Sequence, residues 1–181
     1  MRRVFSAITA CAALAVLAPF ALADAAGAAT THHVHPGESI QRAVNRSAPG
    51  DTVVVESGTY AQTVRISTSH INLIGRGATI VPPASPEGFR CLDDGAPAFG
   101  ICIGARPKDP GPVDGVTVQG FTVKNFHNSG IFAVGTTNLT LSRNTVIDNV
   151  EYGLAAFSTV GTRMVNNTAS GSEEANIYLG D

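Results

Sequence analysis

Tryptophan is absent from this 181-residue chain, methionine occurs twice, and charged residues make up only 14% of it. Twelve basic residues stand against 14 acidic ones, for a net charge of −2. A protein that binds nucleic acid normally presents a basic face, so this composition excludes a nucleic-acid partner. The plentiful glycine, asparagine, threonine and valine favour a β-rich fold with many turns.

Long apolar runs are also missing, except at the N-terminus. There, two arginines precede an apolar run that ends at Leu22, and residues 21–23 fit the small-x-small rule for signal-peptide cleavage. The run is near the lower length limit for a spanning helix and is broken by Pro19, which argues against an uncleaved anchor. We therefore expect a signal peptide at 1–23, a secreted protein with a flexible mature N-terminus at 24–31, and no membrane span after cleavage.

Cysteine is scarce, and its three residues are consistent with export. Cys11 leaves with the signal peptide, so Cys91 and Cys102 remain as an even pair in an oxidising compartment. A metal pair is the alternative, but no nearby histidine or cysteine completes a set of four ligands. We predict a disulfide that closes a glycine- and proline-rich loop and stabilises it by roughly 2–3 kcal/mol in the chain-entropy model.

An internal repeat dominates the second half of the chain. Segments 116–123, 139–146 and 162–169 align without gaps, which gives a 23-residue period. Each repeat has three short β-like runs that cannot bury an apolar face alone, so we expect parallel strands stacked about 4.8 Å apart around one core. Alternation along the strands assigns the following residues to the core of the first two coils: Val116, Val118, Val123, Ile131, Ala133, Leu139, Leu141, Val146, Leu154 and Ala156.

Asn144 and Asn167 lie one repeat apart, at the sharp corner between two strands. Asparagine tolerates left-handed backbone geometry, and identical residues on adjacent coils can form an amide ladder. We interpret both residues as structural.

A module at the N-terminal end, residues 32–66, is expected to close the solenoid. Ser39 is a suitable N-cap, and Ile40, Ala43 and Val44 give helical spacing with an apolar stripe, which predicts a short capping helix. Residues 52–55 and 63–66 are expected to be strands, and 58–60 the turn that leads into the second of them.

The β-helix domain, 32–181, then continues with coils and a Cys-bridged excursion at 67–115 and with the 23-residue repeats at 116–181. This division predicts about five coils. No closing segment follows the last strand, and solenoids of this type usually need a cap, so we expect the domain to be C-terminally incomplete, a fragment.

The 23-residue period, the corner asparagines, the glycine-isoleucine strands and the segment 34–60 together resemble the pectate-lyase-like right-handed parallel β-helix superfamily. The resemblance covers nearly all of 34–181. It implies an all-β fold, a right-handed parallel β-helix solenoid with an N-terminal capping helix. It is specific for fold and not for activity, because the superfamily includes lyases, hydrolases, epimerases, adhesins and proteins without enzymatic activity.

Acidic residues recur at the turn before the glycine-isoleucine strands. Asn128, Glu151 and Glu174 each lie one repeat apart and should stack on successive coils, with Asp148 in the same turn as Glu151. Two carboxylates about 5 Å apart are a geometry of retaining glycosidases, and they also suit a calcium ion. Asp148, Glu151 and Glu174 are therefore candidate catalytic residues. The alternative is a solvated polar turn without chemistry.

Aromatic side chains are expected on the outward face of the same strands. Phe132, Ala155 and Tyr178 form one outward column, with Phe157 next to it. Exposed rings beside carboxylates can stack on sugars, and apolar surface patches often mark ligand sites. In the alternative, the excursion at 82–112 folds back and covers these rings. The candidate substrate-binding residues are Phe132, Phe157, Tyr178, His127 and Lys124.

His32, His33 and His35 resemble a metal tract, and secreted histidine clusters can bind copper or zinc. Two outward histidines on an edge strand are also an ordinary solvated face. One branch of the superfamily, the accessory proteins of nitrous oxide reductase, handles copper, so a periplasmic or extracellular metal-handling role stays open.

The favoured interpretation is a secreted protein that binds or processes an extracellular polysaccharide or cell-surface glycan. If it is an enzyme, the resemblance implies a polysaccharide lyase or a glycoside hydrolase. No cofactor is required for binding, and calcium is the metal that the acidic turn would take. The alternative from another class is a non-catalytic solenoid for structure or adhesion. Metal ligands and oligomeric state are not assigned.

Overall fold

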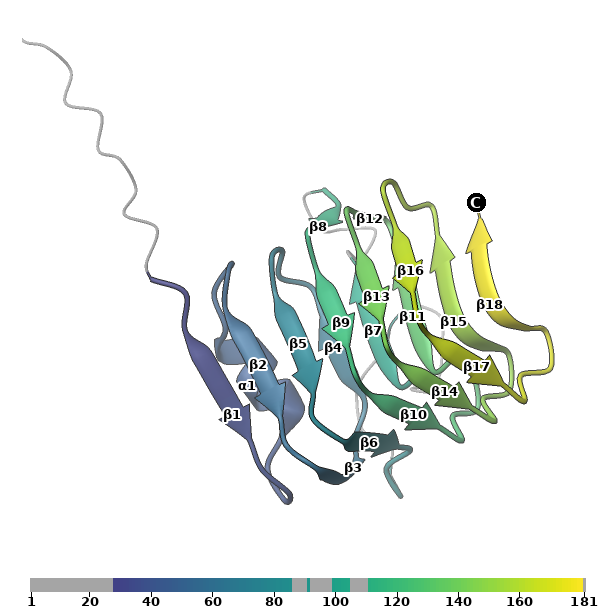
Figure 1. Ribbon diagram of the computed structural model, residues 1–181, viewed down its shortest axis with the longest axis horizontal. Helices are drawn as coiled ribbons and strands as arrows, with labels where there is room; N and C mark the ends of the chain where they lie inside the picture. The colour runs from purple at the N-terminus through teal and green to yellow at the C-terminus, as the bar shows by residue number, and fades with distance from the viewer. Residues whose placement is uncertain (1–27, 86–90, 92–98, 105–110, 181) are drawn as a thin grey trace, which may run out of the picture.

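Three parallel sheets wind around one long axis in the computed structural model, which describes residues 28–85, 91, 99–104 and 111–180 (Figure 1). Sheet A consists of β1 (Thr31–Val34), β2 (Thr52–Val55), β5 (Asn72–Gly75), β9 (Thr117–Gln119), β13 (Thr140–Ser142) and β16 (Arg163–Val165). Sheet B consists of β3 (Gly58–Ala61), β6 (Ala78–Val81), β10 (Thr122–Lys124), β14 (Thr145–Ile147) and β17 (Thr168–Ser170). Sheet C consists of β4 (Val64–Ile66), β7 (Ile101–Gly104), β11 (Ile131–Val134), β15 (Tyr152–Phe157) and β18 (Ala175–Gly180).

The winding is right-handed. In Figure 1 the chain descends along sheet A at the front, passes through sheet B at the bottom, rises along sheet C behind and advances to the right. Sheet A has six strands, so the solenoid has six coils where the sequence predicts about five. The additional coil begins with β1, the edge strand that pairs with β2. The right-handed parallel β-solenoid that the superfamily resemblance implies is confirmed.

Strand register confirms the 23-residue repeat. In sheet A, Val118 pairs with Leu141, and Leu141 pairs with Met164. Sheets B and C keep the same spacing. Upstream, Leu73 pairs with Val118, so the coil between them is longer and contains the Cys-bridged excursion. All ten residues that the sequence assigns to the core of the first two repeats are buried. The two short strands β8 (Val113–Asp114) and β12 (Thr136–Thr137) pair outside the three sheets.

Asn144 and Asn167 form the expected ladder, through an Nδ2-to-Oδ1 hydrogen bond of 3.1 Å. The left-handed residues are not these asparagines but the residues directly before them, Arg143 (φ 54°) and Asn166 (φ 56°). The reason is that each asparagine turns its amide inward to bond backbone groups of the preceding coil, so the chain reverses one residue earlier. Asn149, which the sequence analysis did not single out, is fully buried and bonds the preceding coil in the same way. Its amide accepts the N–H of Phe126 and donates to Val123 O.

Helix α1 (Ile40–Arg46) covers the first coil, as expected. The Ser39 hydroxyl accepts a hydrogen bond from the backbone N–H of Arg42 at 3.2 Å, which is the N-cap that the sequence predicts. Gly58–Ala61 is a strand of sheet B and not the expected turn, because the Tyr60 side chain points into the core and its hydroxyl donates to Glu56 O.

At the opposite end, two aliphatic residues of β18 are exposed, Ile177 by 49% and Leu179 by 58%. The expected signal peptide, 1–23, lies outside the described residues. Within the described part, no helix is long and apolar enough to cross a membrane. The stretch expected to be a flexible N-terminus, 24–31, ends in ordered structure. β1 begins at Thr31, and the N–H of Thr30 donates to Asp51 Oδ1 at 2.7 Å.

Candidate functional site

The outer face of sheet C carries the expected column. Cys102 of β7 pairs with Phe132 of β11, Phe132 with Ala155 of β15, and Ala155 with Tyr178 of β18. Because strand neighbours in a parallel sheet point the same way, these four side chains form one outward row along the solenoid. The row packs as a hydrophobic cluster separate from the main core.

Part of this row is covered by the excursion. The predicted disulfide is present between Cys91 and Cys102, with a Cα–Cα distance of 5.7 Å. It holds Cys91 against sheet C, and the ring of Phe99, also from the excursion, lies 4.9 Å from that of Phe132. Phe132 is consequently only 7% exposed, and its ring lies 5.4 Å from that of Phe157. The structure therefore gives no support to a substrate-binding role for Phe132, because almost none of its ring is exposed to a ligand.

Three half-buried rings remain on the last two coils: Tyr152, Phe157 and Tyr178, called here the aromatic platform. Phe157 and Tyr178 stack with centroids 4.7 Å apart and an interplanar angle of 28°. Tyr152 lies 5.6 Å from each of them. Offset and tilted contacts at these distances favour a fixed arrangement of the rings. The platform thus presents a partly exposed apolar surface made by two neighbouring strands.

The acidic column, Asn128, Glu151 and Glu174, runs beside the platform at the turn between sheets B and C. The N–H of Glu151 donates to Asn128 O at 2.9 Å, and the N–H of Glu174 donates to Glu151 O at 3.1 Å. The stacking on successive coils is therefore confirmed for the backbone. Gly130, in the same turn, has no room for a side chain, because a Cβ would lie 2.8 Å from Asn149 Nδ2 and 2.9 Å from Gly153 O.

Tyr152 joins the acidic column to the aromatic platform. A hydrogen-bonding interaction with the Glu174 carboxylate, followed by partial burial and the charges of Glu174, Tyr178 and Glu151, raises the pKa of Tyr152 to about 12. Sequence reasoning missed Tyr152, because its offset from Glu174 is one position short of the repeat period. The available signal was its position directly after Glu151.

Tyr152 should therefore remain protonated at a pH that ionises an ordinary tyrosine. Its folded pKa lies above the usual 10.0, so the stabilisation from this bond is present below pH 10 and is lost as the pH rises through about 12. Replacing Glu174 with glutamine removes the charged acceptor, and we expect the pKa of Tyr152 to fall toward 10.0. Phenolate absorbance during an alkaline titration measures this, with Tyr152→Phe identifying the signal. A Tyr152 titration that is unchanged in Glu174→Gln would contradict the assignment.

The other candidate residues lie along the same turn without joining this contact. Asp148 has a left-handed backbone (φ 52°), and its N–H donates to Ser170 O at 2.9 Å. Lys124 pairs with Ile147 in sheet B, one coil before the acidic pair, and His127 follows in the same earlier coil. In the described part of the chain, the structure records no hydrogen bond or ion pair between these three side chains and Glu151 or Glu174. Catalytic roles for Asp148, Glu151 and Glu174 stay predictions.

Two histidines of the tract, His32 and His33, contact different carboxylates. His32 Nε2 lies 3.2 Å from Asp51 Oδ2, and His33 Nδ1 lies 3.0 Å from Glu56 Oε1. The backbone hydrogen bonds from Thr30 and Ala48, followed by the bond with His32, lower the pKa of Asp51. No group of three or more potential metal ligands occurs among the described residues.

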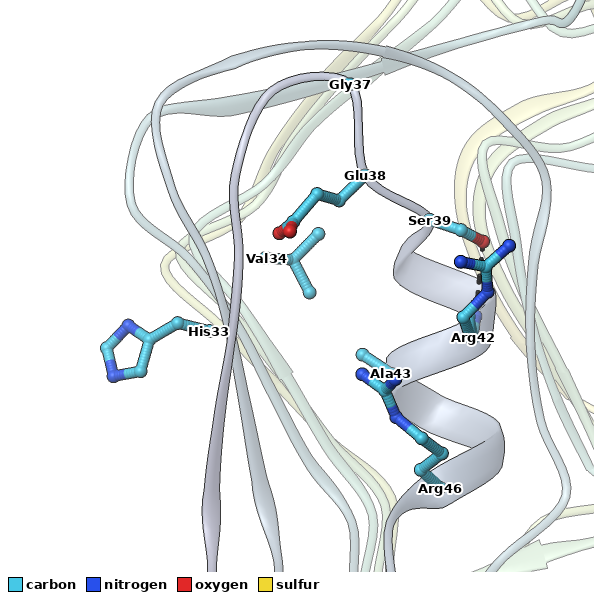
Figure 2. Close-up of a pocket in the computed structure, with 8 residues that line it drawn as sticks. All are labelled: His33, Val34, Gly37, Glu38, Ser39, Arg42, Ala43 and Arg46. Atoms are coloured by element: carbon cyan, nitrogen blue, oxygen red, sulfur yellow. Dashed lines mark hydrogen bonds between the residues drawn. The ribbon is translucent and has the colours of Figure 1, made fainter.

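A hollow of about 240 Å³ lies between β1 and α1 (Figure 2). Glu38 and Arg46 extend toward its interior, whereas the His33 ring points away from it. The Glu38 carboxylate accepts the backbone N–H of His35 at 2.7 Å, which fixes the chain as it enters the helix. The residues that line the hollow include no phenylalanine, tyrosine or tryptophan, and we interpret the hollow as part of the cap.

Comparison with known proteins adds no family and no function. The sequence matches no family profile and no curated protein. A solved structure of a pectin methylesterase mutant in complex with a hexasaccharide is similar, with 13% sequence identity and a TM-score of 0.47. The match covers 76% of this chain and 48% of that one, so this chain spans about half the length of that structure.

Proposed function

We propose that this protein binds an extracellular polysaccharide on the outer face of sheet C. The observation that carries the proposal is the aromatic platform, whose stacked, half-exposed rings lie next to hydrogen-bonding carboxylates. Apolar surface that remains exposed beside polar groups is typical of a ligand site, and flat rings match the apolar faces of sugars. The platform spans the two neighbouring strands β15 and β18, which gives a ligand more than one ring to stack on.

Secretion supports the same proposal. The disulfide between Cys91 and Cys102 belongs to an oxidising compartment, and the leader-like residues 1–23 provide a route to it. Both features support the proposal that the protein is secreted and meets its ligand outside the cell, where polysaccharides are abundant.

The contact between Glu174 and Tyr152 favours binding of the polysaccharide without its cleavage. The Glu174 carboxylate interacts with the Tyr152 hydroxyl and raises the pKa of that phenol, so this member of the predicted catalytic pair already has a partner within the protein. In a retaining glycosidase, one carboxyl group attacks the sugar while the other donates a proton. We therefore rank a non-catalytic binding or adhesion protein ahead of a lyase or hydrolase. New reducing ends or unsaturated products, formed with or without calcium, would reverse this order.

Replacing Phe157 or Tyr178 with alanine is expected to weaken glycan binding by about tenfold, because each substitution removes one ring of the stacked pair. Isothermal titration against oligosaccharides selected from a polysaccharide screen measures the effect. Val160→Ala is the matched control, since Val160 is 70% exposed and lies outside the three sheets. Unchanged affinity in both ring variants, or no glycan bound by the folded protein, would refute the proposal.

A further inference from the structure

In the part of sheet C and its turns that the structure describes for the last two coils, the charged side chains have one sign. The two stretches that pass the acidic turn and sheet C in the last two coils are 144–158 and 167–180. They contain four carboxylates and no lysine, arginine or histidine. The four carboxylates are Asp148, Glu151, Glu173 and Glu174.

Two of these carboxylates act on the platform itself. The Glu174 N–H donates to Glu151 O at 3.1 Å, the Glu174 carboxylate interacts with the Tyr152 hydroxyl, and the Tyr152 ring lies 5.6 Å from that of Tyr178. Glu151 also raises the pKa of Tyr152, which places its negative charge near the same ring. The basic groups of this turn, Lys124 and His127, belong to the coil before Glu151, on the side away from Tyr178. A ligand on the platform therefore meets negative charge.

We propose that the polysaccharide is cationic, a polymer of amino sugars with free amino groups. The inference rests on the binding function proposed above and names the chemical class of its ligand. The platform provides the binding surface, and the carboxylates determine which charge it accepts. An ammonium group on a sugar ring can pair with Glu151 or Glu174 while the ring lies on Phe157 and Tyr178, where a cation is also attracted to the aromatic faces. A polyuronate would bring its own carboxylates against these residues and be repelled.

A basic peptide has the same charge but not the same shape. Lysine side chains are flexible and carry no flat apolar face, whereas each amino-sugar residue combines a rigid ring with one ammonium group. The regular spacing of the coils also suits a repeating polymer. The ligand class therefore follows from the rings and the charge together.

The experiment compares ligands that differ in charge. Oligomers of glucosamine and of N-acetylglucosamine of equal length are titrated into the mature protein in the presence of a chelator, with an oligogalacturonate and polylysine as further probes. We expect the glucosamine oligomer to bind at least about tenfold more tightly than its acetylated form. Glu174→Gln should weaken this binding by about fivefold and leave the acetylated oligomer unaffected. Glu38→Gln, which removes the same charge at the N-terminal cap, is the control.

The outcomes separate the two proposals. Equal or tighter binding of the acetylated or galacturonate oligomer, with sensitivity to Phe157→Ala, would refute the cationic ligand and leave polysaccharide binding intact. Tighter binding of polylysine than of the glucosamine oligomer would assign the face to a basic peptide and refute both. Binding of no glycan by a protein with a native circular dichroism spectrum would also refute both. Equal effects of Glu174→Gln and Glu38→Gln on glucosamine binding would refute the assigned role of the acidic column.

Discussion

Replacing Asn144 with alanine is expected to lower the free energy of unfolding by about 3 kcal/mol. The amide of Asn144 is buried and serves two backbone groups, accepting the N–H of Phe121 at 3.1 Å and donating to Val118 O at 3.0 Å. It also donates to the Oδ1 of Asn167 at 3.1 Å. Alanine leaves the Phe121 N–H and Val118 O without these side-chain partners at a buried corner, which is the expensive case for a buried polar group, whereas Asn167 Oδ1 still accepts the backbone N–H of residue 144 at 2.9 Å.

Urea unfolding followed by circular dichroism measures the loss. Asn45→Ala is the matched control, because the Asn45 amide accepts one exposed hydrogen bond, from Gln41 at 2.8 Å. This substitution should change stability by no more than about 0.5 kcal/mol. If the two variants unfold at the same urea concentration, the asparagine column does not stabilise the corner and the interpretation is wrong.

Replacing Phe126 with alanine should have an effect of similar size, about 4 kcal/mol. The Phe126 side chain is 1% exposed and belongs to the main core beneath the acidic turn. Its N–H is held by Asn149 Oδ1 at 3.1 Å, so the backbone keeps its position and cannot collapse into the space that the ring vacates. The cost is therefore the lost burial of the ring plus the cavity that remains.

Phe126→Leu provides the comparison for this prediction. Leucine keeps most of the apolar volume, so we expect a loss below about 1.5 kcal/mol in the same denaturant titration. A difference between the alanine and leucine variants of less than about 1 kcal/mol would show that the site collapses and that Phe126 does not support the turn.

The repeat and the corner illustrate how far sequence reasoning extends. The repeat period predicts which residues of adjacent coils pair, and the pairing of Val118 with Leu141 and of Phe132 with Ala155 confirms it. The prediction succeeds because a parallel solenoid keeps one register along its axis. At the corner, the amide ladder was predicted but the left-handed position was not, since either Asn144 or the preceding Arg143 satisfied the same spacing.

Contacts between different columns are harder to predict. Tyr152 and Glu174 are neighbours only because the turn between sheets B and C brings the end of one column toward the next. Phe99 covers Phe132 only because the disulfide holds the excursion against sheet C. Neither contact follows the repeat period, so the periodicity alone gave no reason to expect it.

The sequence by itself therefore determined the fold class, the core columns, the capping helix and the pairing of Cys91 with Cys102. These depend on periodicity, on local helix-capping preferences and on the small number of cysteines, all of which can be read along the chain. Only the tertiary structure decided which outward rings remain exposed and which carboxylate meets the aromatic platform. Those features depend on the path of the excursion and on the angle of the turns. Packing between segments distant in sequence sets that path and those angles, and no local pattern encodes them.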